Sequence, residues 1–216
     1  MQGNHMQGII FSHREHPAVD SRVKRLIDIV GALVGLTITA ILLIPIAIAI
    51  QLDDPGPIFY HQVRCGLHGQ PFYMWKFRSM IVDADRLKHA VPNQAKGNLF
   101  KNKNDPRITQ VGKFLRCTSL DEFPQFWNVL LGDMSLIGTR PPTPNEVKQY
   151  QPHHHQRLLV KPGISGEWQV HGRSVIEDFE EVVKLDISYQ EKWSIGYDLK
   201  LILKTIQVVL SKNGAY

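Results

Sequence analysis

Two adjacent carboxylates, Asp121 and Glu122, are the residues in this sequence whose types and spacing best suit chemistry. Ser119 stands three residues before Glu122, and this spacing has the form of a capping box, which predicts that a helix begins here. The positive end of a helix favours ionised carboxylates and attracts phosphate groups. The local pattern leaves an alternative open, in which Glu122 caps a helix, Asp121 complements its dipole, and neither does chemistry.

Basic residues elsewhere in the chain favour the chemical interpretation. Arg116 precedes the two carboxylates, and Arg140 stands in a proline-dense loop over residues 138–144. Arginine is the side chain best suited to grip a phosphate in two places, and a stiff loop would hold it still. Lys76 and Arg78 end one face of a predicted strand. The simpler alternatives are a solvated strand face and a solvent-facing arginine in a turn.

The composition of the chain limits the classes of ligand and partner that it can be expected to bind. The formal net charge is +5, which suits anionic partners such as lipid headgroups or nucleotide phosphates. Nucleic-acid binding is not expected, because the chain lacks a basic helix and an RNA-binding aromatic strand motif. Cys65 and Cys117 have neither disulfide nor zinc spacing. We interpret the histidine run at 153–155 as a loop feature rather than a metal site, since no acidic or cysteine residue accompanies it in sequence.

A membrane element precedes these residues. Residues 1–20 are polar and predict a flexible lead, whereas Ile29 to Leu52 form an uncharged run of 24 residues, long enough for a helix to cross a bilayer core. Basic residues before this run place the N-terminus in the cytoplasm. Pro45 could kink the helix so that it returns to the same face, but membrane helices that contain proline can also span. Both topologies remain open on this pattern.

After residue 53 the sequence predicts an α+β domain. Ile58 to Val63 and Phe72 to Phe77 predict two strands joined by a glycine-containing loop. Helices are expected over residues 84–90, after the carboxylate pair until Gly132, and from Ile176 to Lys192. A final helix from Ile195 carries an apolar stripe with aromatic and lysine flanks, which suits an amphipathic helix at a membrane surface as well as core packing.

Several short motifs, taken together, resemble one family. They are Lys76-Phe77-Arg78-Ser79-Met80, Asp105-Pro106-Arg107, Ser119-Leu120-Asp121-Glu122-Phe123-Pro124-Gln125, Asn128-Val129-Leu130, Gly132-Asp133-Met134-Ser135, Gly138-Thr139-Arg140-Pro141 and Lys161-Pro162-Gly163-Ile164-Ser165-Gly166. In order and spacing they are similar to the bacterial sugar transferases, the monotopic polyprenyl-phosphate phosphoglycosyl transferases. The chain resembles the minimal form, with a membrane anchor and a single catalytic domain.

The resemblance implies an architecture. Residues 1–20 would be the lead, 21–53 a re-entrant membrane helix, and 54–216 a cytoplasmic, mainly helical catalytic domain with a small β-hairpin and interfacial amphipathic helices. The family breaks its membrane helix at a Ser-Pro pair, and here the pair is Ile44-Pro45, which keeps the proline as the expected hinge. The protein is thus expected at the cytoplasmic face of a bacterial inner membrane.

The resemblance also implies a reaction. Sugar 1-phosphate, from a UDP-sugar, would pass to undecaprenyl phosphate, with release of UMP, in the first membrane step of exopolysaccharide, capsule or O-antigen synthesis. Asp121 would be the nucleophile and form a covalent aspartyl-phosphosugar, while Glu122 would help hold Mg²⁺. Arg116 and Arg140 match family arginines near the phosphates. Lys76, Arg78 and Arg107 carry over as nucleotide or structural contacts.

Further partners follow from the same resemblance. Membrane lipids and downstream glycosyltransferases are expected partners, and a homodimer is left open. The segments Gly172-Arg173-Ser174 and Gly214-Ala215-Tyr216 look like those of members that transfer a hexose phosphate. Two other functions compete with the transferase: a membrane-bound metal-dependent phosphatase or pyrophosphatase with water as acceptor, and a non-enzymatic membrane adaptor.

Overall fold

The computed structural model describes residues 15–94, 97, 100, 102, 104–172, 176 and 178–211. The α-helices are α1 (Pro17–Asp20), α2 (Arg22–Asp53), α3 (Gln110–Cys117), α4 (Gln125–Leu131), α5 (Pro144–Val147), α6 (Glu167–Gly172), α7 (Phe179–Lys192) and α8 (Ile195–Ser211). The 3₁₀ helices are η1 (Leu67–Gly69), η2 (Ala84–Ala90), η3 (Leu120–Glu122) and η4 (Pro152–Leu159), and the strands are β1 (Phe59–Cys65), β2 (Pro71–Phe77), β3 (Ser135–Ile137) and β4 (Gly163–Ser165). The predicted α+β class, mainly helical with a small β-hairpin, is confirmed.

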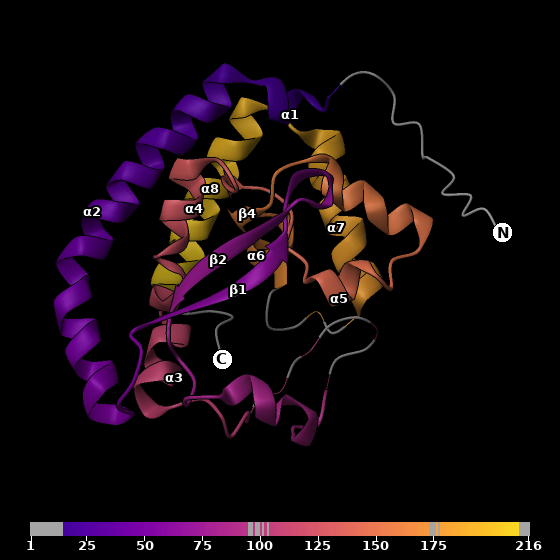
Figure 1. The fold of residues 1–216 in the computed structure, drawn as a ribbon. Coiled ribbons are helices and arrows are strands. Elements are labelled where there is room, and N and C mark those ends of the chain that lie inside the picture. The colour runs from indigo at the N-terminus through magenta and orange to yellow at the C-terminus, as the bar shows by residue number, and fades with distance from the viewer. Residues whose placement is uncertain are drawn as a thin grey trace, which may run out of the picture.

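Helix α2 follows a long arc along one side of the molecule (Figure 1). It begins where the Ser21 hydroxyl accepts a hydrogen bond from the backbone N–H of Lys24 at 3.2 Å. Pro45 lies inside the helix without ending it, so no interruption of the helix marks the predicted hinge. Among the described residues, α2 is the one helix long and apolar enough to cross a membrane, judged by length and composition.

Both ends of α2 are fastened to the same domain. At the first turn, Lys24 Nζ donates to Asp198 Oδ2 of α8 at 2.6 Å. Arg25 donates to two backbone carbonyls at the end of α4, at 2.7 and 2.6 Å. At the last turn, Asp53 Oδ2 accepts a hydrogen bond from the backbone N–H of Val111 in α3 at 2.8 Å. The start and the end of this 32-residue helix therefore contact one folded unit.

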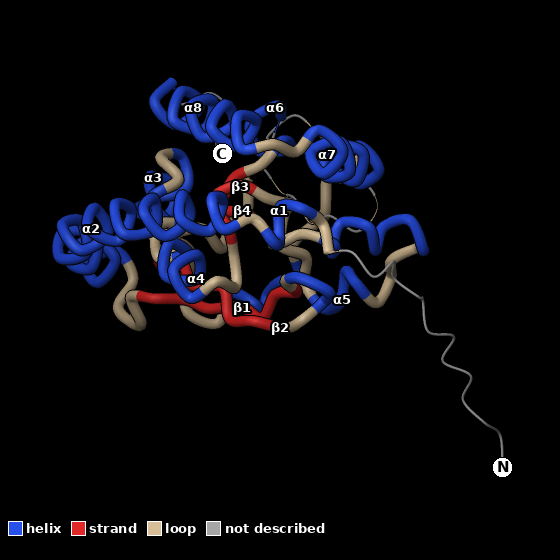
Figure 2. The backbone as a smooth tube through the Cα atoms, turned by 90° about the horizontal axis from the view of Figure 1, so that it is seen from above, coloured by secondary structure: helices blue, strands red, loops and turns tan. Residues whose placement is uncertain are grey.

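The outer side of α2 is apolar and open, whereas its inner side packs on the domain. Ile41 and Ile44 are each 70% exposed. On the inner side, Gly35 lies so close to Phe126 of α4 that an added Cβ would come within 2.4 Å of the ring. Figure 2 shows α2, α4 and the β3–β4 pair between the β1–β2 hairpin on one edge and α8 on the other.

The two sheets are formed in different ways. Strands β1 and β2 pair antiparallel with Tyr60 opposite Lys76, as the alternation and the glycine-containing loop predict. Strands β3 and β4 are a short parallel pair that the sequence analysis did not anticipate. Gly138 and Gly163 meet there, and a Cβ on Gly163 would lie 2.2 Å from the nitrogen of Gly138. Both glycines are therefore required by a close approach of two backbones.

The carboxylate pair lies in a tighter turn than the expected helix start. Ser119 has φ +55° and ψ +17° and makes no side-chain capping hydrogen bond, so the predicted capping box is wrong. An N-cap residue needs extended backbone, and Ser119 is instead the left-handed residue that follows α3. Asp121 and Glu122 belong to η3, and α4 begins after Pro124. Gly132 ends α4 at φ +95°, as predicted.

Other helix predictions are confirmed with adjusted bounds or type. The turn over Ala84–Ala90 is a 3₁₀ helix. Helix α7 begins at Phe179 rather than Ile176, because Asp178 accepts a hydrogen bond from the backbone N–H of Glu180 as its N-cap. Helix α8 carries the predicted apolar stripe, and Ile206 in it is 51% exposed. Within the predicted lead, residues 1–14 lie outside the described residues and 17–20 form α1.

Candidate active site

A cavity of about 730 Å³ brings most of the predicted site residues together. Its walls come from the β1–β2 hairpin, η2, α3, η3 and the proline-dense loop before α5. The predicted residues that line it are Lys76, Arg78, Arg107, Arg116, Asp121 and Arg140. Among the described residues of the lining, eight are basic and five are acidic, so the charge of the cavity favours anions.

Asp121 is buried at this cavity, with only 4% of its surface exposed. The left-handed backbone at Ser119 reverses the chain after α3, so η3 points Asp121 into the domain rather than to the surface. A surface helix cap would be solvated on most of its surface, so burial in a cavity wall does not fit the helix-cap alternative. A carboxylate held in this way can act as a nucleophile toward a bound electrophile.

Glu122 is held by Lys76 of β2. Lys76 Nζ donates to Glu122 Oε1 at 3.1 Å, and both side chains are partly buried. The two elements are further fixed by Asn128 of α4, whose amide accepts from the backbone N–H of Trp75 at 3.1 Å and donates to the carbonyl of Tyr73 at 2.7 Å. Glu122 of η3 and Asn128 of α4 therefore both bind β2, and these contacts position the carboxylate pair against the hairpin.

Arg116 is placed by an unusually close contact between α3 and the end of the hairpin. Its Nε donates to the Ser79 hydroxyl at 2.9 Å. A Cβ on Gly112 of α3 would lie 2.0 Å from the carbonyl oxygen of Ser79, so only glycine allows this approach. The contact brings a guanidinium from α3 to the same cavity wall as Asp121.

Arg78 and Arg107 are buried arginines that each form an ion pair, partly buried for Arg78 and buried for Arg107. Arg78 pairs with the carboxylate and the backbone carbonyl of Asp54, just after α2. Arg107 donates to Asp105 at 2.9 and 2.6 Å, and its hydrogen bonds hold the pKa of Asp105 below the usual value. Both pairs neutralise charge at the cavity wall. The solvated-face alternative for Arg78 is wrong, and the structural role is favoured for both arginines.

Arg140 is also paired. Its guanidinium donates to Glu146 at 3.0 and 3.3 Å, and Glu146 closes a capping box with Thr143 at the start of α5. Burial alone would raise the pKa of Glu146, but the Arg140 charge and its hydrogen bonds outweigh it and lower the pKa. The Cζ atom of Arg140 lies 5.8 Å from the ring centroid of Trp168. The alternative of a solvent-facing arginine in a turn is therefore wrong for Arg140.

Several cavity residues were missed in the sequence. Arg64 of β1, Glu146 and Trp168 line the same space. Thr143 and Glu146 have the same three-residue spacing as Ser119 and Glu122, and the capping box forms at Thr143. No local pattern marks Arg64 or Trp168, because long-range packing brings them there. Most of the residues on which the hexose prediction rests, 173, 174 and 214–216, lie outside the described residues.

Glu122 is the carboxylate predicted to hold Mg²⁺, and Asp121, beside it in sequence, offers a second carboxylate at the cavity wall. Carboxylate oxygens are the ligands that Mg²⁺ prefers, and Mg²⁺ commonly takes one or two of them together with substrate phosphates. Glu122 already accepts a cationic neighbour, the ammonium of Lys76, at 3.1 Å. The carboxylate pair beside a phosphate-attracting cavity therefore fits a magnesium ion bound with its substrate.

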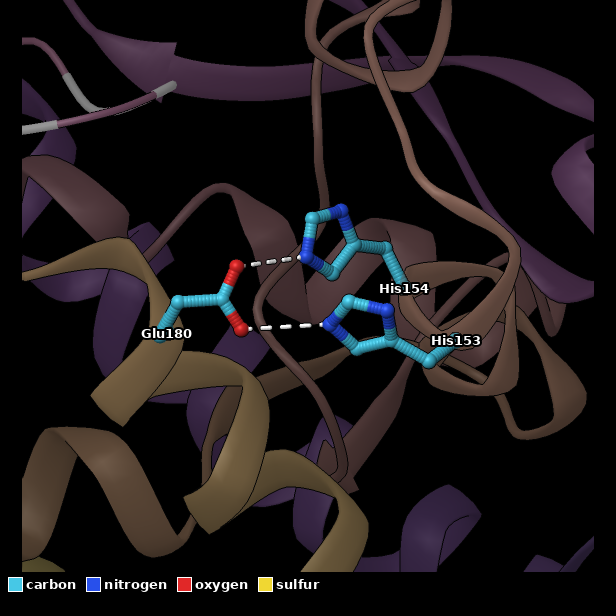
Figure 3. A group of neighbouring side chains, drawn as sticks. All are labelled: His153, His154 and Glu180. Atoms are coloured by element: carbon cyan, nitrogen blue, oxygen red, sulfur yellow. Dashed lines mark hydrogen bonds and ion pairs between the residues drawn. The ribbon is translucent and has the colours of Figure 1, made fainter.

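The histidine run belongs to η4 rather than a loop, and two of its histidines form a cluster with Glu180 outside the lining of this cavity. His153 Nε2 and His154 Nε2 lie 3.2 and 2.8 Å from the two carboxylate oxygens of Glu180 (Figure 3). His154 Nδ1 accepts a hydrogen bond from the backbone N–H of Gln151 at 3.0 Å. The proton of a neutral His154 is therefore on Nε2, which leaves that atom no lone pair for a metal. The cluster fastens η4 to α7.

Comparison with known proteins gives consistent results. Residues 19–212 match the family described as bacterial sugar transferase. Over 194 residues the chain is 52% identical to "Galactosyl transferase CpsE" of Streptococcus agalactiae, and over 200 residues 42% identical to "Undecaprenyl-phosphate galactose phosphotransferase" of Salmonella typhimurium. These matches cover 89% and 90% of this chain but only 43% and 42% of the relatives.

A third relative has a similar length to this chain. It is "Uncharacterized sugar transferase EpsL" of Bacillus subtilis, 38% identical over 192 residues, with 89% of each chain covered. The family match spans helix α2, the hairpin and all the cavity residues described above. The chain therefore belongs to the bacterial sugar transferase family.

Proposed function

We propose that the protein transfers a hexose 1-phosphate from a UDP-sugar to undecaprenyl phosphate and releases UMP. The observation that carries this proposal is the buried Asp121 in a cavity with a surplus of basic residues. Relatives named for galactose or glucose phosphate transfer to undecaprenyl phosphate support the substrate class. The chain covers less than half of the length of each of those relatives, so the activity is assigned from the cavity together with the family.

The proposed chemistry has two displacements at one phosphorus atom. A carboxylate oxygen of Asp121 attacks the β-phosphorus of the UDP-sugar, the bond to the bridging oxygen breaks, and UMP leaves with the electron pair. An oxygen of undecaprenyl phosphate then attacks the same phosphorus and frees Asp121. Arg116 and Lys76 stabilise the charge that develops on the phosphoryl oxygens. Mg²⁺, when bound by Asp121, Glu122 and the substrate, supplies further charge neutralisation.

The membrane topology is part of the proposal. A helix whose first and last turns both contact one domain, and whose outer side is apolar, suits an element that enters the bilayer and returns to the same face. We therefore place residues 54–216 at the cytoplasmic face of a bacterial inner membrane, where a soluble donor and a lipid acceptor can meet. Tags at the two ends that react with an impermeant label only from outside intact cells would contradict this topology.

UMP release by the purified protein tests the reaction. The assay compares UDP-galactose, UDP-glucose and other UDP-sugars, with and without undecaprenyl phosphate, with Mg²⁺ or with EDTA. The variants are wild type, Asp121→Asn and, as a matched control, Asp20→Asn, which removes an exposed carboxylate from α1. Lipid-dependent release that is lost in Asp121→Asn and with EDTA, and unchanged in Asp20→Asn, is the expected result.

The same assay separates the competing functions. UMP formed equally without lipid would identify a hydrolase, because water would then be the acceptor. No UMP from any donor, with a folded protein, would leave the adaptor function. Mass spectrometry of the protein incubated with donor alone would detect a phosphohexose on residue 121 in wild type, and its absence would contradict the covalent step.

A further inference from the structure

Arg64 of β1 lines the same cavity as Asp121 but has no role in the reaction described so far. Its Nη1 donates to the carbonyl of Pro141 at 2.8 Å. Its Nε is buried and has no hydrogen-bond acceptor among the described residues. No carboxylate among the residues that the structure describes lies within ion-pair distance of the Arg64 guanidinium. Arg64 is thus a partly buried cation without a counter-ion of its own.

Other cations of this cavity differ from Arg64 in this respect. The pairs are Lys76 with Glu122, Arg78 with Asp54, Arg107 with Asp105, and Arg140 with Glu146. In each pair a carboxylate offsets the charge within the protein. Burial of a charge without such a partner is costly, and an anion that enters the cavity would recover that cost.

The charges around Arg64 also favour binding of an anion. Arg140 is its principal charged neighbour, and the two carboxylates that act on Arg64, Glu146 and Glu122, already form ion pairs with Arg140 and Lys76. Burial, with the Arg140 charge second, lowers the pKa of Arg64 to about 10. The guanidinium is therefore still charged at neutral pH, and this part of the cavity keeps a surplus positive charge.

Trp168 adds a second donor to this region. It lines the cavity, its ring lies 5.8 Å from Arg140, and its Nε1 is buried without an acceptor among the described residues. Two N–H donors without acceptors beside a surplus positive charge fit an anion with several oxygen atoms. Both donor atoms are buried, so an anion would reach them only after the two side chains move.

We propose that Arg64 is a phosphate-binding residue of the substrate cavity. The identity of its ligand rests on the proposed function, in which two groups share this chemistry: the diphosphate of the UDP-sugar and the phosphate of the lipid acceptor. Arg64 would grip a phosphoryl oxygen while its Nη1 keeps its bond to Pro141, so the proline-dense loop and the anion are held by one side chain. Arg140, next to this loop bond, would be steadied by the same contact.

Calorimetric binding tests this assignment without turnover. Wild type, Arg64→Gln, Arg64→Lys and the control Lys184→Gln, which removes one exposed charge from α7, are titrated with UDP, UMP, pyrophosphate and uridine. Arg64→Gln should weaken UDP binding about 10- to 100-fold, the range expected for a lost hydrogen bond to a charged group, and leave uridine binding unchanged. Arg64→Lys should lose less, and Lys184→Gln should bind like wild type.

Two measurements, UDP binding and the KM for undecaprenyl phosphate, identify which substrate supplies the phosphate that Arg64 binds. Weaker UDP binding identifies the donor diphosphate, whereas unchanged UDP binding with a raised KM for undecaprenyl phosphate identifies the lipid phosphate. Unchanged binding of every ligand together with an unchanged lipid KM would overturn the proposal. An equal loss for uridine and UDP would also overturn it, because Arg64 would then only support the shape of the cavity.

The titrations test the Arg64 assignment independently of whether the protein proves to be a transferase. If wild type binds UDP but releases no UMP from any donor, the transferase function fails while the Arg64 assignment is still decided by the titrations. If Arg64→Gln does not fold, as judged by its melting temperature, the charge-retaining Arg64→Lys provides the comparison. Wild type that binds none of the four ligands and has no activity with the lipid would overturn both.

Discussion

Lys76 Nζ lies 3.1 Å from Glu122 Oε1, and this ion pair joins strand β2 to the turn that carries Asp121. The lysine and glutamate side chains are 23% and 14% exposed, so salt screens the pair less than it would at the surface. The amide of Asn128 fastens the helix after this turn to the backbone of the same strand. Two contacts thus fix the position of the carboxylate pair relative to the hairpin.

We expect Lys76→Gln to reduce lipid-dependent UMP release about 10- to 1000-fold, because the variant loses both the positioning of Glu122 and a positive charge at the phosphates. Lys184→Gln is the matched control and should keep wild-type activity. In the double variant Lys76→Gln with Glu122→Gln, the fold loss of UMP release should be smaller than the product of the two single losses, because the residues act as a pair. Multiplicative losses in this double-mutant cycle would contradict the coupling.

Gly112→Ala should destabilise the protein and move Arg116. The new Cβ would lie 2.0 Å from the carbonyl oxygen of Ser79, which is backbone and cannot rotate away. A cost of about 1–3 kcal/mol is typical of overpacking. Gly196→Ala is the control, because the nearest atom to its added Cβ is 4.0 Å away. A melting temperature equal to that of wild type in Gly112→Ala would mean that α3 does not approach the hairpin this closely.

The pair of Asp105 and Arg107 predicts a pH dependence of stability. Hydrogen bonds from Arg107 lower the pKa of Asp105 in the folded state, so its stabilisation is complete above the unfolded pKa of about 4 and is lost as the pH falls through the folded pKa. Because the pair is buried, Asp105→Asn should cost about 3–5 kcal/mol at pH 7, measured by unfolding in detergent. The difference between wild type and variant should shrink below pH 4.

An exposed pair provides the control for this pH series. Asp83 and Arg86 lie 3.7 Å apart with side chains that are 64% and 83% exposed, so Asp83→Asn should change the stability little at any pH. Asparagine also tolerates the left-handed backbone at this position, φ +60°. A difference between wild type and Asp105→Asn that stays constant from pH 7 to pH 3 would show that Asp105 does not titrate with folding.

The hairpin and the long helices could be predicted from sequence because their signals are local. Alternation over seven residues and a glycine-containing loop specify β1 and β2, and an uncharged run specifies α2. The capping box could not be assigned in the same way, because the S/T-x-x-E pattern occurs five times in the sequence, among them at Ser119 and at Thr143. Thr143 has extended backbone and caps a helix, whereas Ser119 is left-handed because α3 ends directly before it. The end of the preceding helix decides between them.

The candidate site was predictable in part. Six predicted residues line one cavity, but their grouping was implied by family motifs rather than by any local spacing. Strands β3 and β4 have three residues each and pair across 25 residues of chain, too short and too distant for a periodic signal. Arg64 alternates with its neighbours like any strand residue. Only packing against the proline-dense loop distinguishes it.

The anchor of α2 to α8 gives the last prediction. Lys24 Nζ donates to Asp198 at 2.6 Å and to the carbonyl of Ile137 at 3.0 Å, and both charged side chains are less than 10% exposed. Lys24→Met keeps the apolar stem but leaves Asp198 as a buried carboxylate without its cation, so we expect a loss of about 3–5 kcal/mol in unfolding free energy. Arg22→Met, at an exposed position two residues earlier, is the control and should change little. If the two variants unfold alike in detergent, the first turn of α2 is not held to α8 by this ion pair.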